Sequence, residues 1–156
     1  MLALACPARA ATSDYVRLHV IASDDTPAAQ ALKLEVRDAV LSRARALLEG
    51  VGDAQTAWAV VNDNLDGLEA ASCAVCADAV CKLGVYPFPT RVYGGAVVPA
   101  GNYRALRVII GEGKGHNWWC VLYPSMCYPE AWQSDGGAFH STLWRWLTSL
   151  FGGDRA

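Results

Sequence analysis

Apolar and polar positions near the start of the chain follow a period of two. Val16, Leu18 and Val20 lie on one side of this pattern, which predicts a strand over Tyr15–Ile21. The other side carries Tyr15, Arg17, His19 and Ile21. This face therefore mixes aromatic, cationic and apolar residues, whereas the first face is wholly aliphatic.

The period then changes to that of a helix. Ser23–Asp25 supplies a turn, Thr26 is a typical N-cap, and Pro27 suits the first helical position. The pattern predicts one long helix that runs to Glu49 and stops at Gly50. Its solvent stripe consists of Glu35, Asp38, Ser42, Arg45 and Glu49, and the opposite stripe of Leu32, Val36, Val40 and Leu47.

Two shorter helices are expected next, one capped by Asp53 and one by Asp66. The segment Ala79–Leu83 is open to two interpretations. Local propensity favours a continuation of the third helix to Gly84, and a short strand is the alternative.

Extended structure dominates from Val85 onward. Pro87 and Pro89 forbid a helix in Val85–Gly95 and suit an edge strand. Tyr103–Ile110 alternates like a strand, and Asn117–Tyr123 is apolar on both faces, like a strand covered on both sides. Gly111–His116 between them reads GEGKGH, which is too polar and glycine-rich for either element and is predicted to be a loop.

The order of these elements predicts one α+β domain over residues 15–128. It has an N-terminal strand, a segment of two to three helices and a mainly antiparallel sheet. Residues 129–156 are expected to form a loop and a terminal amphipathic helix over Ala138–Phe151. Residues 1–14 are interpreted as the remnant of an export signal or as a disordered leader.

Composition narrows the function classes. The 156 residues are 53% hydrophobic and 18% charged, which is typical of a globular core and not of a disordered chain. A net charge of −2 gives no electrostatic reason to expect nucleic acid as a partner. No apolar stretch reaches the roughly 18 residues that a membrane-spanning helix needs.

Enzymatic and cofactor chemistry finds little support. The Gly111–His116 loop lacks the spacing and the hydroxyl residue of a phosphate-binding loop, so no nucleotide cofactor is expected. A zinc site built from Cys73, Cys76 and Cys81 would lack a second ligand pair, and core packing is the simpler interpretation. We therefore predict no metal and no cofactor.

A cysteine hydrolase acting on peptide or cell-wall amides is the catalytic alternative. Cys120 would be the nucleophile and His116 or His140 its base. Four residues of extended chain would separate His116 from Cys120 by about 13 Å, at ~3.3 Å per residue, which is too far for direct proton transfer. Cys120 is also a disulfide candidate with Cys127 across the turn at Tyr123–Ser125, if the compartment is oxidising.

A partner-binding surface is the remaining hypothesis. Charged, polar and aromatic residues gather on or beside the predicted sheet, and Trp, Tyr and Arg dominate protein interfaces. The candidates are Arg91, Arg107, Glu112, Lys114, His116, Asn117 and Trp118. The alternative is that Trp118 and Trp119 are core residues on opposite faces of one strand.

Three stretches together resemble the stage II sporulation protein R family of endospore-forming Gram-positive bacteria. They are YVRLHVIASDDTPAAQALKLEVRDAV (Tyr15–Val40), YPFPTRVYGG (Tyr86–Gly95) and PAGNYRALRVIIGEGKGHNWWCVLYPSMC (Pro99–Cys127). With the helices between them they cover about two-thirds of the chain in order. The match excludes Cys73, Cys76 and Cys81, and assigns them no role.

The resemblance implies a secreted signalling protein without catalysis of its own. Such a protein is exported from the forespore into the intermembrane space, where it activates a membrane-embedded aspartic protease that processes the sigma-E precursor. The family pattern also favours Ala79–Leu83 as a strand. Because the leader is short, export is inferred from the resemblance and not read from the chain.

Overall fold

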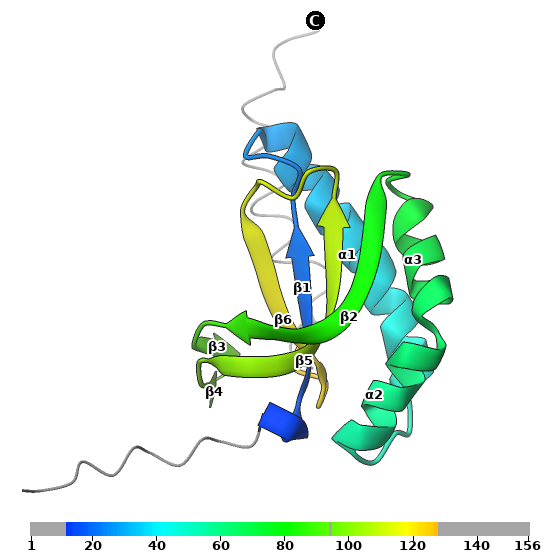
Figure 1. Ribbon diagram of the computed structural model, residues 1–156, viewed down its shortest axis with the longest axis vertical. Helices are drawn as coiled ribbons and strands as arrows, with labels where there is room; N and C mark the ends of the chain where they lie inside the picture. The colour runs from blue at the N-terminus through cyan, green and yellow to red at the C-terminus, as the bar shows by residue number, and fades with distance from the viewer. Residues whose placement is uncertain (1–11, 94, 128–156) are drawn as a thin grey trace, which may run out of the picture.

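The computed structural model describes residues 12–93 and 95–127. Three α-helices and six strands follow one another in these residues, after one short 3-10 helix (Figure 1). In chain order they are η1 (Thr12–Asp14), β1 (Val16–Ile21), α1 (Pro27–Leu48), α2 (Ala54–Asp63), α3 (Leu65–Cys73), β2 (Ala79–Phe88), β3 (Arg91–Tyr93), β4 (Ala96–Val98), β5 (Gly101–Ile110) and β6 (Asn117–Tyr123).

The main sheet is mixed and has the strand order β2-β5-β1-β6. Its two central strands, β1 and β5, run parallel, with Leu18 opposite Leu106. The outer pairs, β2 with β5 and β1 with β6, are antiparallel. The α+β class is confirmed, but the sheet is mixed where a mainly antiparallel one was predicted, because β1 and β5 pair across the helices and hairpin that separate them in sequence.

Aliphatic side chains hold the three helices against one face of this sheet (Figure 1). Apolar residues recur in α1 at helical spacing, so one stripe of the helix faces the strands. The fully buried members of this helix-side core include Val16, Leu18, Val20, Val36, Val40, Leu68, Leu106 and Val108. The predicted strand and the predicted α1 stripes are therefore confirmed.

A second, smaller core covers the opposite face. Figure 1 shows that β2 and β5 bend, so that their distal ends run across the other strands beside the short β3–β4 hairpin. The buried residues of this hairpin-side core are Phe88, Val98, Tyr103, Ala105 and Val121. Trp118 packs on the helix-side core and Trp119 on the hairpin-side core, so the two indoles do lie on opposite faces of β6.

The local signals for helix starts were right twice and wrong once. Thr26 caps α1 by accepting a hydrogen bond from the Ala29 amide, and Asp53 caps α2 in the same way through Thr56. The predicted cap at Asp66 is wrong, because α3 already begins at Leu65. Only Asn64 separates α2 from α3, and its side-chain amide donates to the Val60 carbonyl of α2.

The segment Ala79–Leu83, for which the sequence left helix and strand as alternatives, is a strand. It pairs with β5 over its whole length, from Ala79 opposite Ile110 onward, and Cys81 enters the helix-side core. This ladder outweighs the weak helical preference of the segment. The predicted terminal helix Ala138–Phe151 lies outside the described residues, as does the predicted leader apart from Thr12–Asp14.

Candidate functional site

The glycine-rich loop lies at the end of the sheet where the two parallel strands finish. Gly111–His116 follows β5, and the turn Ala22–Thr26 follows β1. Because parallel strands place their carboxyl ends at the same edge, the two segments meet there. The sequence predicted each segment separately and did not predict their contact.

Backbone hydrogen bonds dock the loop onto the turn. The Lys114 amide donates to the Ser23 carbonyl at 3.1 Å, and the Gly115 amide donates to the Ala22 carbonyl at 2.9 Å. A Cβ on Gly115 would lie 2.2 Å from the Asp24 carbonyl oxygen, so only glycine fits at this position. Backbone hydrogen bonds therefore hold the loop directly against the turn that follows β1.

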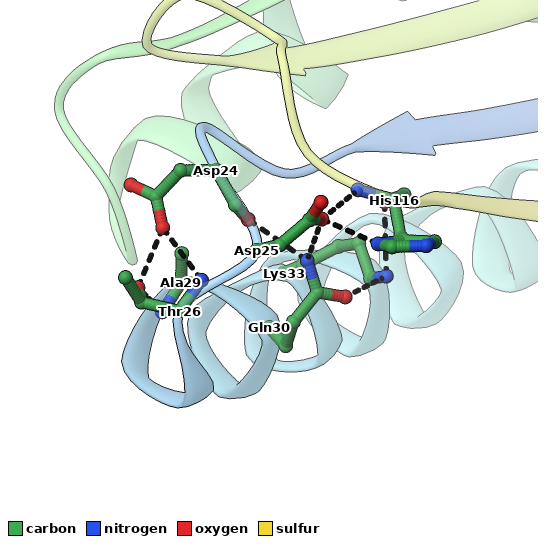
Figure 2. Close-up of polar contacts among 7 residues, drawn as sticks. All are labelled: Asp24, Asp25, Thr26, Ala29, Gln30, Lys33 and His116. Atoms are coloured by element: carbon green, nitrogen blue, oxygen red, sulfur yellow. Dashed lines mark hydrogen bonds and ion pairs between the residues drawn. The ribbon is translucent and has the colours of Figure 1, made fainter.

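Side chains complete the contact (Figure 2). Asp25 Oδ1 accepts the His116 amide at 2.7 Å and lies 2.5 Å from His116 Nδ1. Lys33 is buried, and its ammonium donates to the Gln30 side-chain oxygen at 2.6 Å and to the His116 carbonyl at 3.1 Å. One carboxylate and one ammonium, both supplied by the turn and α1, therefore fix the end of the loop.

The pKa values of the two charged side chains in this contact are both lowered, but for different reasons. Hydrogen bonds from the His116 side chain and amide lower the pKa of Asp25, and burial lowers the pKa of Lys33. Asp24 accepts both the amide and the hydroxyl of Thr26, which lowers the pKa of its carboxyl. The turn below the loop is thus built from carboxylates that are hydrogen-bonded in their ionised form.

Three of the predicted contact residues project from the docked loop. Glu112 and Lys114 form an ion pair at 2.6 Å, and about three-quarters of each side chain is exposed. The His116 ring is also exposed, beside Asp25. These three residues form one charged edge, which we call the loop edge.

The other four candidates lie elsewhere. Trp118 faces the helices, where the Arg37 guanidinium lies 5.1 Å from its ring centre. Asn117 and Arg107 belong to the hairpin side of the sheet, and Arg91 is exposed on β3. The structure thus divides the predicted surface into the loop edge, one helix-side tryptophan and a group on the hairpin side.

Sequence reasoning missed a cationic and aromatic cluster on that hairpin side. Arg17 is fully buried, with its guanidinium 4.3 Å from the Phe88 ring centre and 4.9 Å from that of Tyr103. It donates to the Cys120 carbonyl at 2.9 Å and to the Tyr93 hydroxyl at 3.0 Å. The available signal was an arginine in the middle of an apolar strand.

His19 is the second buried polar residue of this cluster. Its ring stacks on Trp119 at 3.8 Å between centroids, and Nε2 lies 2.9 Å from the Asn117 side-chain oxygen. Burial, together with the nearby charge of Arg107, lowers the pKa of His19 to about 4. The imidazole is therefore neutral at physiological pH.

The five cysteines that the structure describes give no nucleophile near the loop. Cys120 and Cys127 are joined by a disulfide, so neither carries a thiol that could attack a substrate. Cys73, Cys76 and Cys81 are free, and burial raises the pKa of the Cys81 thiol to about 11. Within the described residues, no group of three or more His, Cys, Asp or Glu side chains is placed to hold a metal ion.

Within residues 12–93 and 95–127, no helix is both long enough and apolar enough to cross a membrane.

The chain is similar to proteins of one known family. A family model described as stage II sporulation protein R (spore_II_R) matches residues 12–133. The protein named stage II sporulation protein R from Bacillus subtilis (strain 168) is 32% identical over 123 residues, which cover 72% of this chain and 53% of that relative. The chain thus spans about half the length of this curated relative. No solved structure matches the chain.

Proposed function

This chain belongs to the stage II sporulation protein R family, and we propose that it acts in sporulation as a signal that activates a membrane-embedded aspartic protease. In this proposal the protein is exported from the forespore into the intermembrane space. There it binds the protease, which then processes the sigma-E precursor. Family membership supports the role in sporulation, and the finer steps are proposed from the resemblance and from the geometry of the loop edge.

The observation that carries the proposal is the docking of Gly111–His116 onto the turn after β1. Hydrogen bonds from Lys114, Gly115 and His116 fix the loop before any partner arrives. A preformed surface loses less conformational entropy on binding than a mobile one. The two stretches Tyr15–Val40 and Pro99–Cys127, which carry the family resemblance, supply the two sides of this contact.

The loop edge presents charge that the fold does not need. An ion pair as exposed as Glu112–Lys114 contributes little to stability, because water screens it and two flexible side chains must be ordered. Both groups are therefore free to exchange this contact for one with a partner. Charged groups at the rim of an interface mainly set association rate and partner choice.

A binding role accounts for the loop edge better than the hydrolase alternative. The hydrolase required a thiolate at Cys120, and this sulfur is bonded to Cys127. His116 Nδ1 is directed to Asp25, and Cys120 is buried in β6. We therefore propose protein binding without catalysis as the activity of this chain.

Charge reversal at the loop edge tests the proposal. Glu112→Lys and Lys114→Glu should each reduce processing of the sigma-E precursor by about tenfold or more in a reconstituted assay with the full chain and the protease. The expected cause is repulsion of the partner, since neither side chain supports the fold. Circular dichroism and thermal unfolding of each variant verify that the fold is unchanged.

Glu35→Lys is the matched control for Glu112→Lys, because it changes the net charge equally at an exposed position on the solvent side of α1. With this control variant, the protease should process the precursor as it does with the unmodified chain. Two results would contradict the assignment of the loop edge as the contact. One is normal processing of the precursor with both loop-edge variants, and the other is an equal loss of processing with the Glu35→Lys variant.

A further inference from the structure

The charged residues in the strands of the described part of the chain are all cationic. The six strands of the described residues contain no Asp or Glu, although the whole chain has a net charge of −2. They contain five cations, which are Arg17, Lys82, Arg91, Arg104 and Arg107. Positive charge is thus concentrated in the sheet of a chain that is acidic overall.

Three neighbouring strands place two of these cations and a histidine in one row across the hairpin side of the sheet. Lys82 of β2 is opposite Arg107 of β5, Arg107 is opposite His19 of β1, and His19 is opposite Trp119 of β6. Side chains of residues in register share one face of a sheet. We call Lys82, Arg107 and the neutral His19 the cationic row, after its two charged members, and Arg17 lies two residues before His19 on the same face.

Buried polar atoms along this face have no partner within the described part of the chain. They are Nδ1 of His19, Nε of Arg107 and Nη1 of Arg17. His19 is only 4% exposed and Arg17 is fully buried. Because Nε2 of the neutral His19 ring donates to the Asn117 side-chain oxygen, its Nδ1 is an acceptor, whereas the two arginine nitrogens are donors. A buried donor without an acceptor costs roughly 1–3 kcal/mol, so the two arginine donors on one face indicate that acceptors are missing there.

No carboxylate of the described residues neutralises these cations. The ion pairs found there join Arg37 with Asp38, Lys114 with Glu112 and His116 with Asp25, all away from the row. Burial and, to a smaller extent, the charge of Arg107 lower the pKa of His19, and burial and, to a smaller extent, the charge of Arg91 lower the pKa of Arg17. An anion is the acceptor that best suits unpaired cationic donors in such a place.

We propose that the cationic row binds a carboxylate on an extended acidic segment of a partner protein. The central carbon of the Arg107 guanidinium lies over the Tyr86 ring, 4.8 Å from its centre, and this contact holds the group in place to donate to a carboxylate. Lys82 supplies a second, exposed charge beside it. This proposal stands apart from the loop edge and does not depend on which protein the loop edge binds.

The surroundings favour a peptide over a bare anion or a nucleic acid. Val80 is 45% exposed, lies two residues before Lys82 on the same face, and offers an apolar contact beside the row. Trp119 borders the row on the other side. An extended segment with a carboxylate next to an apolar side chain fits this sequence of contacts.

Titration with defined peptides tests the proposal. The probe is an acetylated, amidated peptide of alternating glutamate and alanine, and its control is the same peptide with glutamine for glutamate. In the isotope-labelled full chain, the glutamate peptide should shift the NMR signals of the Arg107 Nε–H and the His19 ring. The glutamine peptide should not, because it carries no charge for the row to bind.

Two arginines of β5 provide matched variants. Arg107→Met should raise the dissociation constant of the glutamate peptide about tenfold or more, as expected for loss of a charge-assisted hydrogen bond. Arg104→Met should leave it unchanged, because Arg104 faces the helices and donates to Gln55 at 2.6 Å. The NMR fingerprint of each variant verifies folding, and Lys82→Met gives an independent test should Arg107→Met not fold.

Several outcomes would overturn the proposal. One is equal binding of the two peptides, and another is equal loss in the Arg104→Met and Arg107→Met variants. Tighter binding of a single-stranded oligonucleotide than of the peptide would mean that the row takes phosphate. Binding that occurs only after Glu130→Gln, Asp135→Asn and Asp154→Asn are combined would mean that the carboxylate belongs to this chain and not to a partner.

Discussion

The two faces of the central sheet are built from adjacent residues of the same strands but by different chemistry. On β1, Leu18 and Arg17 are neighbours, and both are fully buried. Leu18 joins an aliphatic core under three helices. Arg17 enters a set of aromatic rings and donates two hydrogen bonds.

The two faces therefore differ in what they contribute: one stabilises the fold, and the other carries polar groups that can bind a ligand. The helix-side core gains its free energy from burial of apolar surface and leaves few polar groups to satisfy. The hairpin side buries the Arg17 guanidinium, and its desolvation is only partly offset by carbonyl and hydroxyl acceptors and by ring faces. We therefore expect the helix side to hold the fold together and the hairpin side to be the more sensitive to pH and to ligands.

The largest expected effect lies on the helix side. Leu18→Ala removes a fully buried side chain from the centre of the sheet and should lower the free energy of unfolding by about 2–5 kcal/mol. Chemical denaturation followed by fluorescence measures this change. Val85→Ala, at a residue that is 64% exposed, is the control and should change stability by less than about 0.5 kcal/mol. A cost for Leu18→Ala no larger than that of the control would remove the basis of the comparison.

A pH titration tests the hairpin side. His19 has a folded pKa of about 4 against an ordinary value of 6.5, so the unfolded chain binds more protons between these two values. Stability is therefore fully present above about pH 6.5 and is lost as the pH falls toward 4. The unmodified chain should lose about 3 kcal/mol more than the His19→Gln variant between pH 7 and pH 4.

The comparison with His19→Gln isolates the histidine from the carboxylates that also titrate at acidic pH. Glutamine retains a polar group near the Asn117 side chain. The groups that face His19 are Arg107 of β5, Asn117 and Trp119 of β6, and Phe88 of β2. Parallel stability curves for the two proteins across this range would mean that His19 is hydrated and titrates normally.

The fold could be predicted from sequence where the signal was local. The α1 stripe, the Thr26 cap and the glycine-rich loop each depend on residues close together in the chain, and all three were right. The parallel pairing of β1 with β5 could not be predicted, because the two strands lie more than 80 residues apart. The strand at Ala79–Leu83 was undecided for the same reason, since its ladder partner decides its conformation.

The candidate site shows the same limit. The exposed charges of Glu112 and Lys114 followed from the composition of the loop. The carboxylate that holds the loop, Asp25, is 91 residues away from His116 and looked like an ordinary turn residue. Arg17 was interpreted only as one member of a mixed strand face. No pattern in the sequence shows that β2 and β5 bend (Figure 1), or that the rings of Phe88 and Tyr103 come to lie against its guanidinium.

The smallest expected effect concerns the acceptor that Arg17 uses. The Tyr93 hydroxyl accepts a hydrogen bond from Arg17 Nη2 and donates one to the Trp119 carbonyl at 3.1 Å. Tyr93→Phe removes both bonds and leaves Arg17 with a second unpartnered nitrogen, so we expect a loss of about 1–2 kcal/mol in the free energy of unfolding. Tyr86→Phe, on the same face, is the control and should change stability by less than about 0.5 kcal/mol. If Tyr93→Phe were as neutral as this control, the guanidinium would have another acceptor, and burial of Arg17 would need no help from the hairpin.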